Sequence, residues 1–298
     1  MLRRVRHWGP GLLLLSPSLI VLGVFVYGLI AWTVNLSLQN KHSALPSEGF
    51  VGLNNYTNLF TNDISDRFTH SLRNLAVFTV VFIVGTLVMG VVWAVLLERG
   101  ARAEGLFRTI YLFPMAVSFV ASGVVWRWLM NSGTGDNAGG LNVIFKGLGL
   151  TFLENRWWTD PNWGMAAMAL PAIWQLSGYI MALFLAGFRG IPHELREAAV
   201  MDGASTFQLY RRVLFPQVTP VALSALIILG HVSMKMFDLI MSVSGGQYLT
   251  EVPSTYIWQV LQYSDQAKAA AIAVFLLLVV AVVIVPYLVY VNRVEKRS

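Results

Sequence analysis

The stretch EAAVMDGASTFQLYRRVLFPQVTP, residues 197–220, is a charged and patterned segment between two long apolar runs of the chain. Just before it, Pro192 can open a helix at its first turn, and Glu194 and Glu197 then lie where the positive end of that helix favours acids. Gly203 is available to cap the C-terminus of the same helix. The pattern therefore predicts a short helix that ends at Gly203.

A second short helix is predicted directly after the first. Ser205 is its predicted N-cap, and Pro216 and Pro220 break the backbone again further on. The two helices and the turn between them, residues 192–216, are called the elbow below. A charged elbow between apolar runs is typical of a docking surface beside a membrane.

The composition indicates a membrane protein. Of the 298 residues, 56% are hydrophobic and 12% are charged, and the mean hydropathy is +0.62. Soluble domains carry about 25% charged residues. A helix needs roughly 20 mainly apolar residues to cross a bilayer. Six segments qualify: Gly11 to Leu38, Leu75 to Leu97, Thr109 to Leu129, Trp163 to Phe188, Leu214 to Met241 and Ala269 to Val291.

The first segment follows Arg3, Arg4 and Arg6 and could be confused with a cleavable signal peptide. Its apolar run is longer than a signal peptide allows, and no small-residue cleavage pattern follows, so we expect an uncleaved first helix. The chain contains no cysteine, which excludes disulfides and cysteine metal sites. We expect short tails at 1–10 and 292–298 around one transmembrane domain at 11–291.

Lysine and arginine near span ends are retained on the cytoplasmic side of a membrane. With both termini inside, the cytoplasmic side holds Arg3, Arg4, Arg6, Arg99, Arg102, Arg108, Arg189, Arg196, Arg211, Arg212, Arg293, Lys296 and Arg297. The opposite loops are poorer in positive charge and longer, so this orientation places the elbow in the cytoplasm. The outer loops carry Trp157, Trp158 and Trp163, for which an interfacial belt is favoured over stacking on a sugar.

Polar residues inside spans are costly and need a reason. In the predicted fifth helix, His231, Lys235 and Asp238 fall on one face and Ser233 and Phe237 on nearly the opposite one. For Lys235 and Asp238 an i,i+3 ion pair competes with a ligand-binding role. For His231 a helix-packing hydrogen bond is favoured.

The predicted fourth helix carries Gln175 and Tyr179, which lie four residues apart on one face, with Gly178 beside them. An amide and a phenol can bind sugar hydroxyls, and glycine leaves room for a ligand or a neighbouring helix. Helix packing is the alternative, and these residues alone favour neither. Arg127, between two tryptophans, is expected to anchor the chain at the membrane interface.

The elbow resembles the EAA loop of binding-protein-dependent ABC importer permeases. The resemblance is carried by Glu197-Ala198-Ala199, three residues, Gly203, nine residues, and then residues 213–216 (VLFP). Val213 and Phe215 stand where the family usually has isoleucine and leucine, and both keep apolar bulk. Further runs look like the sugar branch of these permeases, of the maltose and glycerol-phosphate type: GLNNYTNLF, SLRNLAVFT, LFRTIYLFPMAVS, VVWRWLMNSGTG, LAGFRGIPHELREAA and SGGQYLTEVPSTYIWQ.

Together these runs cover roughly residues 50–290, with the family core at about 70–290. The chain resembles the first of the two paired permeases in such a complex. It departs from the family at Gln247, where a proline usually follows two glycines. The resemblance implies an all-α membrane protein with six transmembrane helices, the type I ABC importer permease fold, and a cytoplasmic EAA loop between helices four and five.

The resemblance also implies roles for individual residues. Glu197, Ala198, Ala199, Asp202 and Gly203 would couple the chain to an ATPase subunit. The substrate pathway would include Gln175, Tyr179, Ser233 and Phe237, with Lys235 and Asp238 as secondary candidates. The implied partners are a second permease, two ATPase subunits that use ATP and Mg, an extracytoplasmic solute-binding protein and a sugar.

The expected function is therefore translocation of a sugar through the plasma membrane of a prokaryote. No GxxxxGK[ST] motif occurs in the chain, so we expect no ATP site, no catalytic residues and no cofactor or metal of its own. The alternative is a secondary transporter coupled to ions at Lys235, Asp238 and His231. A membrane enzyme is disfavoured because HExxH, GxSxG and a cysteine nucleophile are absent from the sequence.

Overall fold

The computed structural model describes residues 14–43, 49–61, 66–100 and 103–295. The predicted N-terminal tail, 1–10, and the last three residues of the predicted C-terminal tail lie outside these ranges. Arg3, Arg4, Arg6, Arg102, Lys296 and Arg297 therefore lie outside the described residues. Within them the chain is helical, and an isolated antiparallel bridge joins Gln39 to Phe50. The chain divides into unit 1, residues 1–68 and 256–279, and unit 2, residues 69–255 and 280–298.

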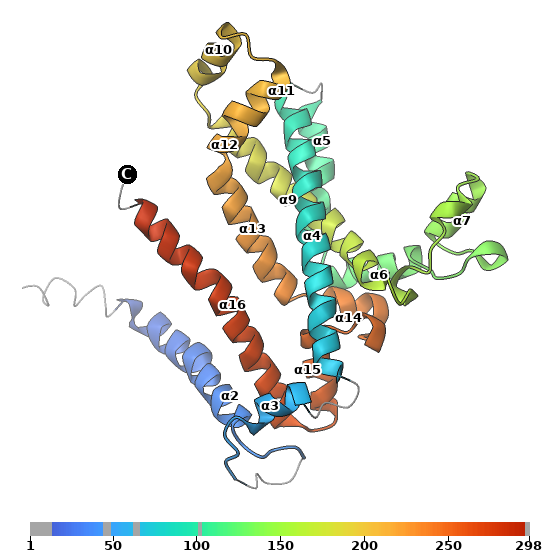
Figure 1. The fold of residues 1–298 in the computed structure, drawn as a ribbon, viewed down its shortest axis with the longest axis vertical. Helices are drawn as coiled ribbons and strands as arrows, with labels where there is room; N and C mark the ends of the chain where they lie inside the picture. Colours follow the sequence, from blue (N-terminus) through green and yellow to red (C-terminus); the bar gives the residue numbers. More distant parts are fainter. Residues whose placement is uncertain (1–13, 44–48, 62–65, 101–102, 296–298) are drawn as a thin grey trace, which may run out of the picture. The chain divides into compact units, whose positions relative to one another are not determined.

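The helices are, in order, η1 (Gly23–Gly28), α2 (Leu29–Ser37), α3 (Asn54–Thr61), α4 (Arg67–Glu98), α5 (Glu104–Leu112), η3 (Phe113–Ala116), α6 (Phe119–Leu129), η4 (Gly135–Asn137), α7 (Leu141–Gly147), η5 (Thr151–Leu153), η6 (Trp157–Thr159), α8 (Gly164–Ala167), α9 (Ala169–Arg189), α10 (His193–Met201), α11 (Thr206–Leu209), η7 (Tyr210–Leu214), α12 (Phe215–Gln217), α13 (Thr219–Met234), α14 (Asp238–Ser244), η8 (Tyr248–Thr250), α15 (Pro253–Gln262) and α16 (Gln266–Glu295). Figure 1 labels most of them along the chain.

Four helices are long and apolar enough to cross a membrane, and the number rises to six if each of two bent helix pairs is one span. The helix Leu14–Ser37 contains η1 and α2, and the most apolar stretch of it buries no residue within the chain. The others are α4, the pair α8 and α9, and Gln266–Pro286 of α16. These four lie close to the predicted first, second, fourth and sixth spans.

Unit 1 is held together by aromatic and polar contacts. The rings of Phe60, Phe68 and Phe275 meet edge to face, with centroids 5.2 to 5.8 Å apart. His42 Nδ1 lies 2.8 Å from the Asp265 carboxylate, which ties the segment after α2 to the start of α16.

Helix α9 is the most buried of the four long candidate spans in the described part of the chain. Small residues of α4 allow α9 to approach closely: a Cβ on Gly90 would lie 2.6 Å from Ile180, and one on Gly85 would collide with Ile173. Close packing at small residues is the usual way in which helices associate within lipid. This contact fixes α4 against α9 over two turns.

Gly178 of α9 allows the neighbouring helix α5 to approach closely. A Cβ at this position would collide with the backbone carbonyl oxygen of Tyr111 in α5. Of the two explanations for this glycine, a ligand or a neighbouring helix, the structure gives the second. The carbonyl is backbone, so it cannot swing away as a side chain would.

The predicted third span, 109–129, is not one continuous helix. The helical pair begins at Glu104 and bends by 99° between Ala116 and Phe119. Pro114 starts a tighter helical turn, Val117 is extended, and Ser118 caps α6 by accepting a hydrogen bond from the amide of Ala121. The proline and the new N-cap explain the bend.

The prediction of one fifth helix over 214–241 is also wrong. The chain bends by 66° at Val218, α13 ends at Met234, and α14 begins only at Asp238. Lys235 and Asp238 therefore belong to different segments, and the helical-face argument does not apply to them. Helix α14 instead packs closely on α6, where a Cβ at Gly123 would lie 2.5 Å from Ser242.

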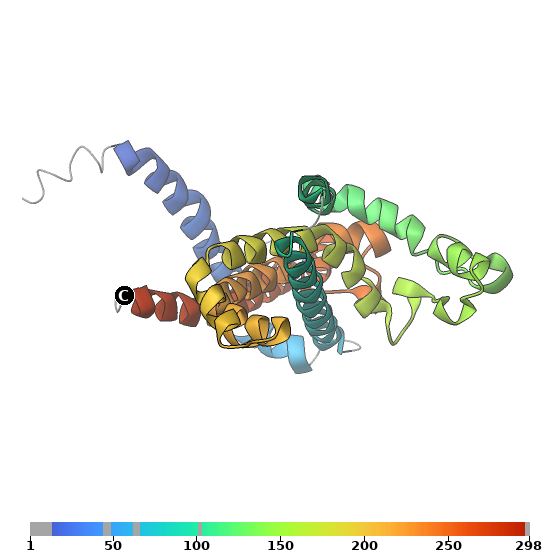
Figure 2. The ribbon, with the colours of Figure 1, turned by 90° about the horizontal axis from the view of Figure 1, so that it is seen from above.

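The outer segment after α6 is organised by Asn142, which is fully buried. Its amide nitrogen donates to the carbonyls of Gly133 and Asn155, and its oxygen accepts from the indole of Trp157. Trp157 is buried here, so its predicted place in an interfacial belt is wrong, whereas Trp163 is 67% exposed. Figures 1 and 2 both show α7 set to one side of α9 within unit 2.

Asp160 stands where this outer segment enters α8. Its carboxylate accepts hydrogen bonds from the backbone amides of Trp163 (3.0 Å) and Asn162 (2.8 Å). These bonds hold the pKa of Asp160 below its usual value because they favour the charged form.

We expect Gly178→Ala to destabilise unit 2 by about 1 to 3 kcal/mol, because the added methyl group meets a backbone atom that cannot move. Thermal unfolding of the detergent-solubilised protein measures this effect. The matched control is Gly230→Ala in α13, where a Cβ would meet nothing within 4 Å. Equal unfolding temperatures for the two variants would contradict the packing described for α9 and α5.

Candidate functional site

The first helix of the elbow, α10, is ended by glycine. Pro192 is its N-cap residue and Asp202 its C-cap residue, and Gly203 follows with a φ of 80°. The amide of Gly203 donates to the carbonyl of Val200, and the amide of Ala204 donates to the carbonyl of Ala199. This pair of bonds is a Schellman motif, which needs a left-handed residue, and it confirms the predicted glycine cap.

The second helix of the elbow, α11, starts with a capping box. The Ser205 hydroxyl accepts from the amide of Gln208, and the Gln208 side chain accepts from the amide of Ser205. The predicted N-cap at Ser205 is confirmed. The end of α10 and the start of α11 are therefore both capped, so the turn between the two short helices is a defined structure rather than a loose loop.

The elbow exposes both charged and apolar side chains. Helix α10 has no buried residue, and Glu197, Ala198, Asp202 and Gly203 are exposed while Ala199 is half-buried. Large apolar side chains accompany them: Met201 is 86% exposed and Phe207 70% exposed. Large apolar side chains left exposed beside charged ones favour an interaction surface.

A polar hollow of about 350 Å³ lies within the elbow. Its lining contains Ala199, Asp202 and Gly203, which are three of the predicted coupling residues. The remaining lining residues are Ala204, Gln208, Arg212 and Val213. An acid and a base at the rim of one hollow can position a polar side chain of a partner.

The base of the elbow is tied to α4 by Glu98. The Glu98 carboxylate accepts hydrogen bonds from the Arg196 guanidinium of α10 and from the Tyr210 hydroxyl of η7. Arg196 also donates from Nη2 to the carbonyl of Phe188, at 2.6 Å. The charges of Glu98 and Arg196 balance, which a carboxylate removed from water requires.

Sequence reasoning missed this network. It predicts only an orienting role for Arg196 and Arg99 and no role for Glu98 and Tyr210. The available signal was that Glu98 is the acid that ends the long apolar run of α4. Its partner could not be found from spacing because Arg196 lies 98 residues further along the chain.

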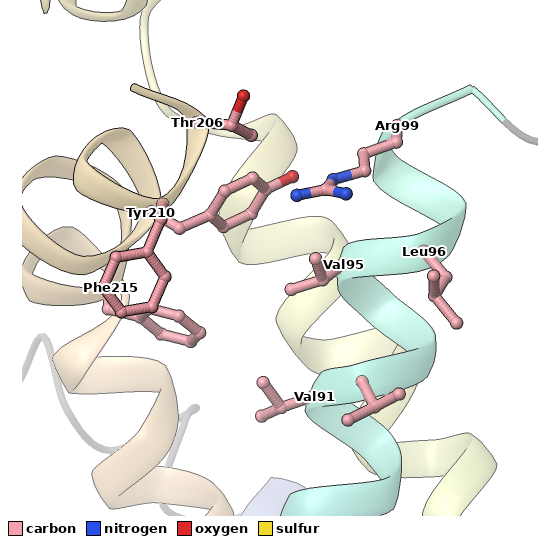
Figure 3. Close-up of a pocket in the computed structure, with 9 residues that line it drawn as sticks. Val91, Val95, Leu96, Arg99, Thr206, Tyr210 and Phe215 are labelled. Atoms are coloured by element: carbon pink, nitrogen blue, oxygen red, sulfur yellow. The ribbon is translucent and has the colours of Figure 1, made fainter. Parts of the chain in front are cut away.

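An apolar cleft of about 500 Å³ adjoins this network. Valines and a leucine of α4 form one wall, and Phe207, Tyr210 and Phe215 form the other. Figure 3 shows the Arg99 guanidinium beside the hydroxyl end of the Tyr210 side chain. The guanidinium carbon lies 5.4 Å from the centroid of the Tyr210 ring. A second ion pair, Arg189 to Glu104 at 2.8 Å, joins the end of α9 to the start of α5.

Three of the positive residues predicted for one side of the membrane lie at one end of unit 2. Arg99, Arg189 and Arg196 all contact elements at the elbow end, and Figure 1 shows α10 and α11 there beside the end of α4.

Gln175 and Tyr179 lie on α9, as predicted. Gln175 is buried, and its amide nitrogen donates to the carbonyl of Val117 at 2.5 Å, at the bend between η3 and α6. Its side-chain oxygen is buried and has no hydrogen-bond partner in the part of the chain described. Tyr179 is half-buried. The Gln175 amide nitrogen thus binds the Val117 carbonyl, which lies at the bend of the broken span. The Gln175 side-chain oxygen remains available as a hydrogen-bond acceptor.

Ser233, near the end of α13, is buried. Its hydroxyl donates to the carbonyl of Gly230 at 2.8 Å and accepts from the Thr79 hydroxyl of α4 at 3.0 Å. Phe237, which follows the end of α13, is half-buried. The structure therefore places Ser233 at the contact between α13 and α4.

Lys235 and Asp238 are both exposed, and the expected ion pair between them is not formed among the described residues. Helix α13 ends at Met234, before Lys235, and α14 begins at Asp238, so the two residues do not share a helix. The expected packing hydrogen bond of His231 is also missing, since its Nδ1 is buried without a partner in the described ranges. No group of three His, Asp or Glu side chains suited to a metal occurs in those ranges.

Residues 86–298 match the protein family described as "Binding-protein-dependent transport system inner membrane component". The chain is 41% identical over 292 residues to a probable ABC transporter permease protein of Pyrococcus horikoshii, with 96% of this chain and 97% of the relative covered. It is 32% identical over 294 residues to the xylose/arabinose import permease XacH of Haloferax volcanii, with 97% and 87% covered.

The structure is similar to a chain of a bacterial alginate ABC transporter, solved in complex with an alginate pentasaccharide-bound periplasmic protein. The TM-score is 0.79 at 20% identity, and the match covers 100% of this chain and 97% of the other. The similarity bears out the predicted six-span importer permease fold, in which each bent pair counts as one span.

We expect Gly203→Val to loosen α10, because a side chain at a φ of 80° costs about 1 to 2 kcal/mol. Such a cost corresponds to roughly 5- to 30-fold faster hydrogen exchange at the α10 amides. Gly203→Asn is the matched control, since asparagine tolerates this conformation better. Equal exchange in the two variants would show that the cap does not hold the helix.

Proposed function

Because this chain belongs to the family of binding-protein-dependent transport system inner membrane components, it is a permease subunit of an ABC importer, and we propose that the complex carries a sugar into the cell. The observation that supports this role most directly is the elbow. It lies within the matched residues 86–298, exposes four of the five predicted coupling residues and is capped on both sides of the turn between α10 and α11.

A sugar cargo is supported by the relatives. Besides the xylose/arabinose permease, the chain is 26% identical over 286 residues to the glucose import system permease protein GlcT of Saccharolobus solfataricus, with 95% of this chain and 96% of the relative covered. Both relatives are named for sugar import and are matched over nearly the whole chain. We therefore assign the same class of cargo here.

The chain is a multi-pass membrane protein, and we propose that it works with three kinds of partner protein and a sugar. A second permease would complete the pathway, two ATPase subunits would use ATP and Mg, and a solute-binding protein would deliver the sugar. The positive charges gathered at the elbow end support a cytoplasmic elbow, with both termini on the same side. The membrane would then be the plasma membrane of a prokaryote.

We propose that Glu197, Ala198, Ala199, Asp202 and Gly203 form the contact with one ATPase subunit. Closure of the ATPase pair would move the elbow and, through it, α9 and α13 on either side. The cavity would then alternate between the two faces of the membrane. The short capped helices support this because a rigid element transmits displacement better than a loop.

Gln175, Tyr179, Ser233 and Phe237 remain our proposed substrate pathway, with Lys235 and Asp238 as secondary candidates. The unused oxygen of Gln175 lies one helical turn from Tyr179 on α9, so an amide acceptor and a phenol stand on the same face. Sugar hydroxyls need groups of this kind. Lys235 and Asp238 are exposed, which leaves both free to contact a ligand.

The ion-coupled alternative has no support. The family match is to an ATP-dependent class of importer, and Lys235, Asp238 and His231 do not form one cluster, since α13 ends before Lys235 and α14 begins at Asp238.

Glu197→Ala is expected to lower both sugar uptake and ATPase co-purification at least tenfold, because it removes an exposed acid from the docking helix. The test uses the complete transporter purified through a tag on this chain. Glu194→Ala, also exposed on α10, is the matched control and is expected to stay within twofold. Normal assembly and uptake in Glu197→Ala would refute docking at the elbow.

Tyr179→Phe is expected to raise the KM for sugar uptake about fivefold, since a single hydrogen bond contributes about 1 kcal/mol. Uptake of labelled xylose, arabinose and glucose by proteoliposomes measures the change. Tyr263→Phe, at a position 80% exposed, controls for general effects of the substitution. If the complex assembles and KM is unchanged for every transported sugar, Tyr179 does not contact the cargo.

A further inference from the structure

The carboxylate of Glu98 is largely buried at the end of α4. The side chain of Glu98 is 11% exposed, and that of its partner Arg196 is 19% exposed. Burial of a charge is unfavourable unless it is paired and hydrogen-bonded, and here both conditions are met. An exposed loop that only had to present a docking surface would not need a buried ion pair beneath it.

The partners of Glu98 come from both arms of the elbow. Arg196 precedes Glu197 on α10, and Tyr210 follows α11. Arg196 also binds the carbonyl of Phe188 in the last turn of α9. One carboxylate therefore joins the end of α4 to α10 and to η7, and through Arg196 to α9.

Packing cannot replace this link, because α10 contributes no buried residue. The segment that carries Tyr210 is a π-helical turn, Tyr210–Leu214. Such wide turns are rare and frequently occur at functional sites. Tyr210 itself is buried and receives Arg99 over its ring, so its hydroxyl is held where it meets Glu98.

We propose that Glu98 is the positioning residue that transmits movement of the elbow to α4. This inference rests on the proposed function, since it assumes that an ATPase subunit docks on α10. With Glu98 in place, a displacement of α10 also displaces the end of α4. Without the Glu98 carboxylate, α10 can move and its displacement is not transmitted to α4.

Helix α4 can carry the displacement toward the pathway. It has 32 residues, which corresponds to about 48 Å at 1.5 Å per residue. Along this length it packs on α9 at Gly90 and Gly85, and its Thr79 hydroxyl donates to Ser233 of α13. The part of α4 remote from the elbow thus contacts Ser233, a residue of the proposed pathway.

The test substitutes Glu98→Gln, which keeps the shape of the side chain and removes its charge. The complete transporter is reconstituted with its ATPases and binding protein, and sugar uptake is measured per ATP hydrolysed. We expect ATPase co-purification to stay within twofold of the native level and uptake per ATP to fall at least tenfold. The double variant Glu98→Arg with Arg196→Glu restores the ion pair and should recover at least a third of the native ratio.

Glu104→Gln is the matched control, because it removes a more exposed ion pair, to Arg189, at the same end of unit 2. Its uptake per ATP should stay within twofold of the native ratio. If Glu98→Gln does not accumulate in the membrane, the proposal is tested with Tyr210→Phe instead. This variant keeps the ion pair between Glu98 and Arg196 and removes one hydrogen bond to Glu98. We expect Tyr210→Phe to lower sugar uptake per ATP hydrolysed at least threefold.

The proposal is overturned if Glu98→Gln takes up as much sugar per ATP hydrolysed as the native transporter. The same outcome in Tyr210→Phe overturns it if Glu98→Gln does not accumulate in the membrane. So does a loss of uptake that only follows a loss of co-purified ATPase, since Glu98 would then be structural. A failure of the proposed function would look different: Glu197→Ala would keep its ATPase and its uptake whatever Glu98→Gln does.

Discussion

A carboxylate that has left water must be paired, and in this protein that constraint decides where the elbow lies. Glu98 ends the long apolar helix α4, and its charge is balanced by Arg196 and hydrogen-bonded by Tyr210. Those two residues stand on opposite arms of the elbow. The network therefore ties an exposed surface element to two of the membrane helices, in addition to the ring contacts of Tyr210 and Phe215 with Phe188.

The same logic applies to the backbone inside the membrane. A span that breaks frees carbonyl and amide groups, and lipid offers them no partner. Where η3 gives way to α6, Ser118 caps the new helix and the Gln175 side chain binds the carbonyl of Val117. Close approach at Gly178, Gly90 and Gly85 then brings α9 against α5 and α4. The proposed pathway residues lie on helices that these contacts position.

These two sets of interactions are connected by α4. At the C-terminal end of α4, Glu98 binds the elbow through Arg196. Nearer the N-terminal end of α4, Thr79 donates a hydrogen bond to Ser233 of α13. An importer must let a remote ATPase alter a cavity inside the membrane. A long helix pinned at both places gives a physical route, because it can shift as a body while its hydrogen bonds stay intact.

The sequence by itself determined that the chain is a helical membrane protein, the four spans that are continuous helices, and the elbow with its caps at Gly203 and Ser205. These depend on composition, apolar length and local hydrogen bonds, all of which are readable over a few neighbouring residues. Only the tertiary structure decided the breaks at Val117 and after Met234, which separated Lys235 from Asp238, and the burial of Trp157. It alone paired Glu98 with Arg196, since contacts between residues far apart in the chain leave no local pattern.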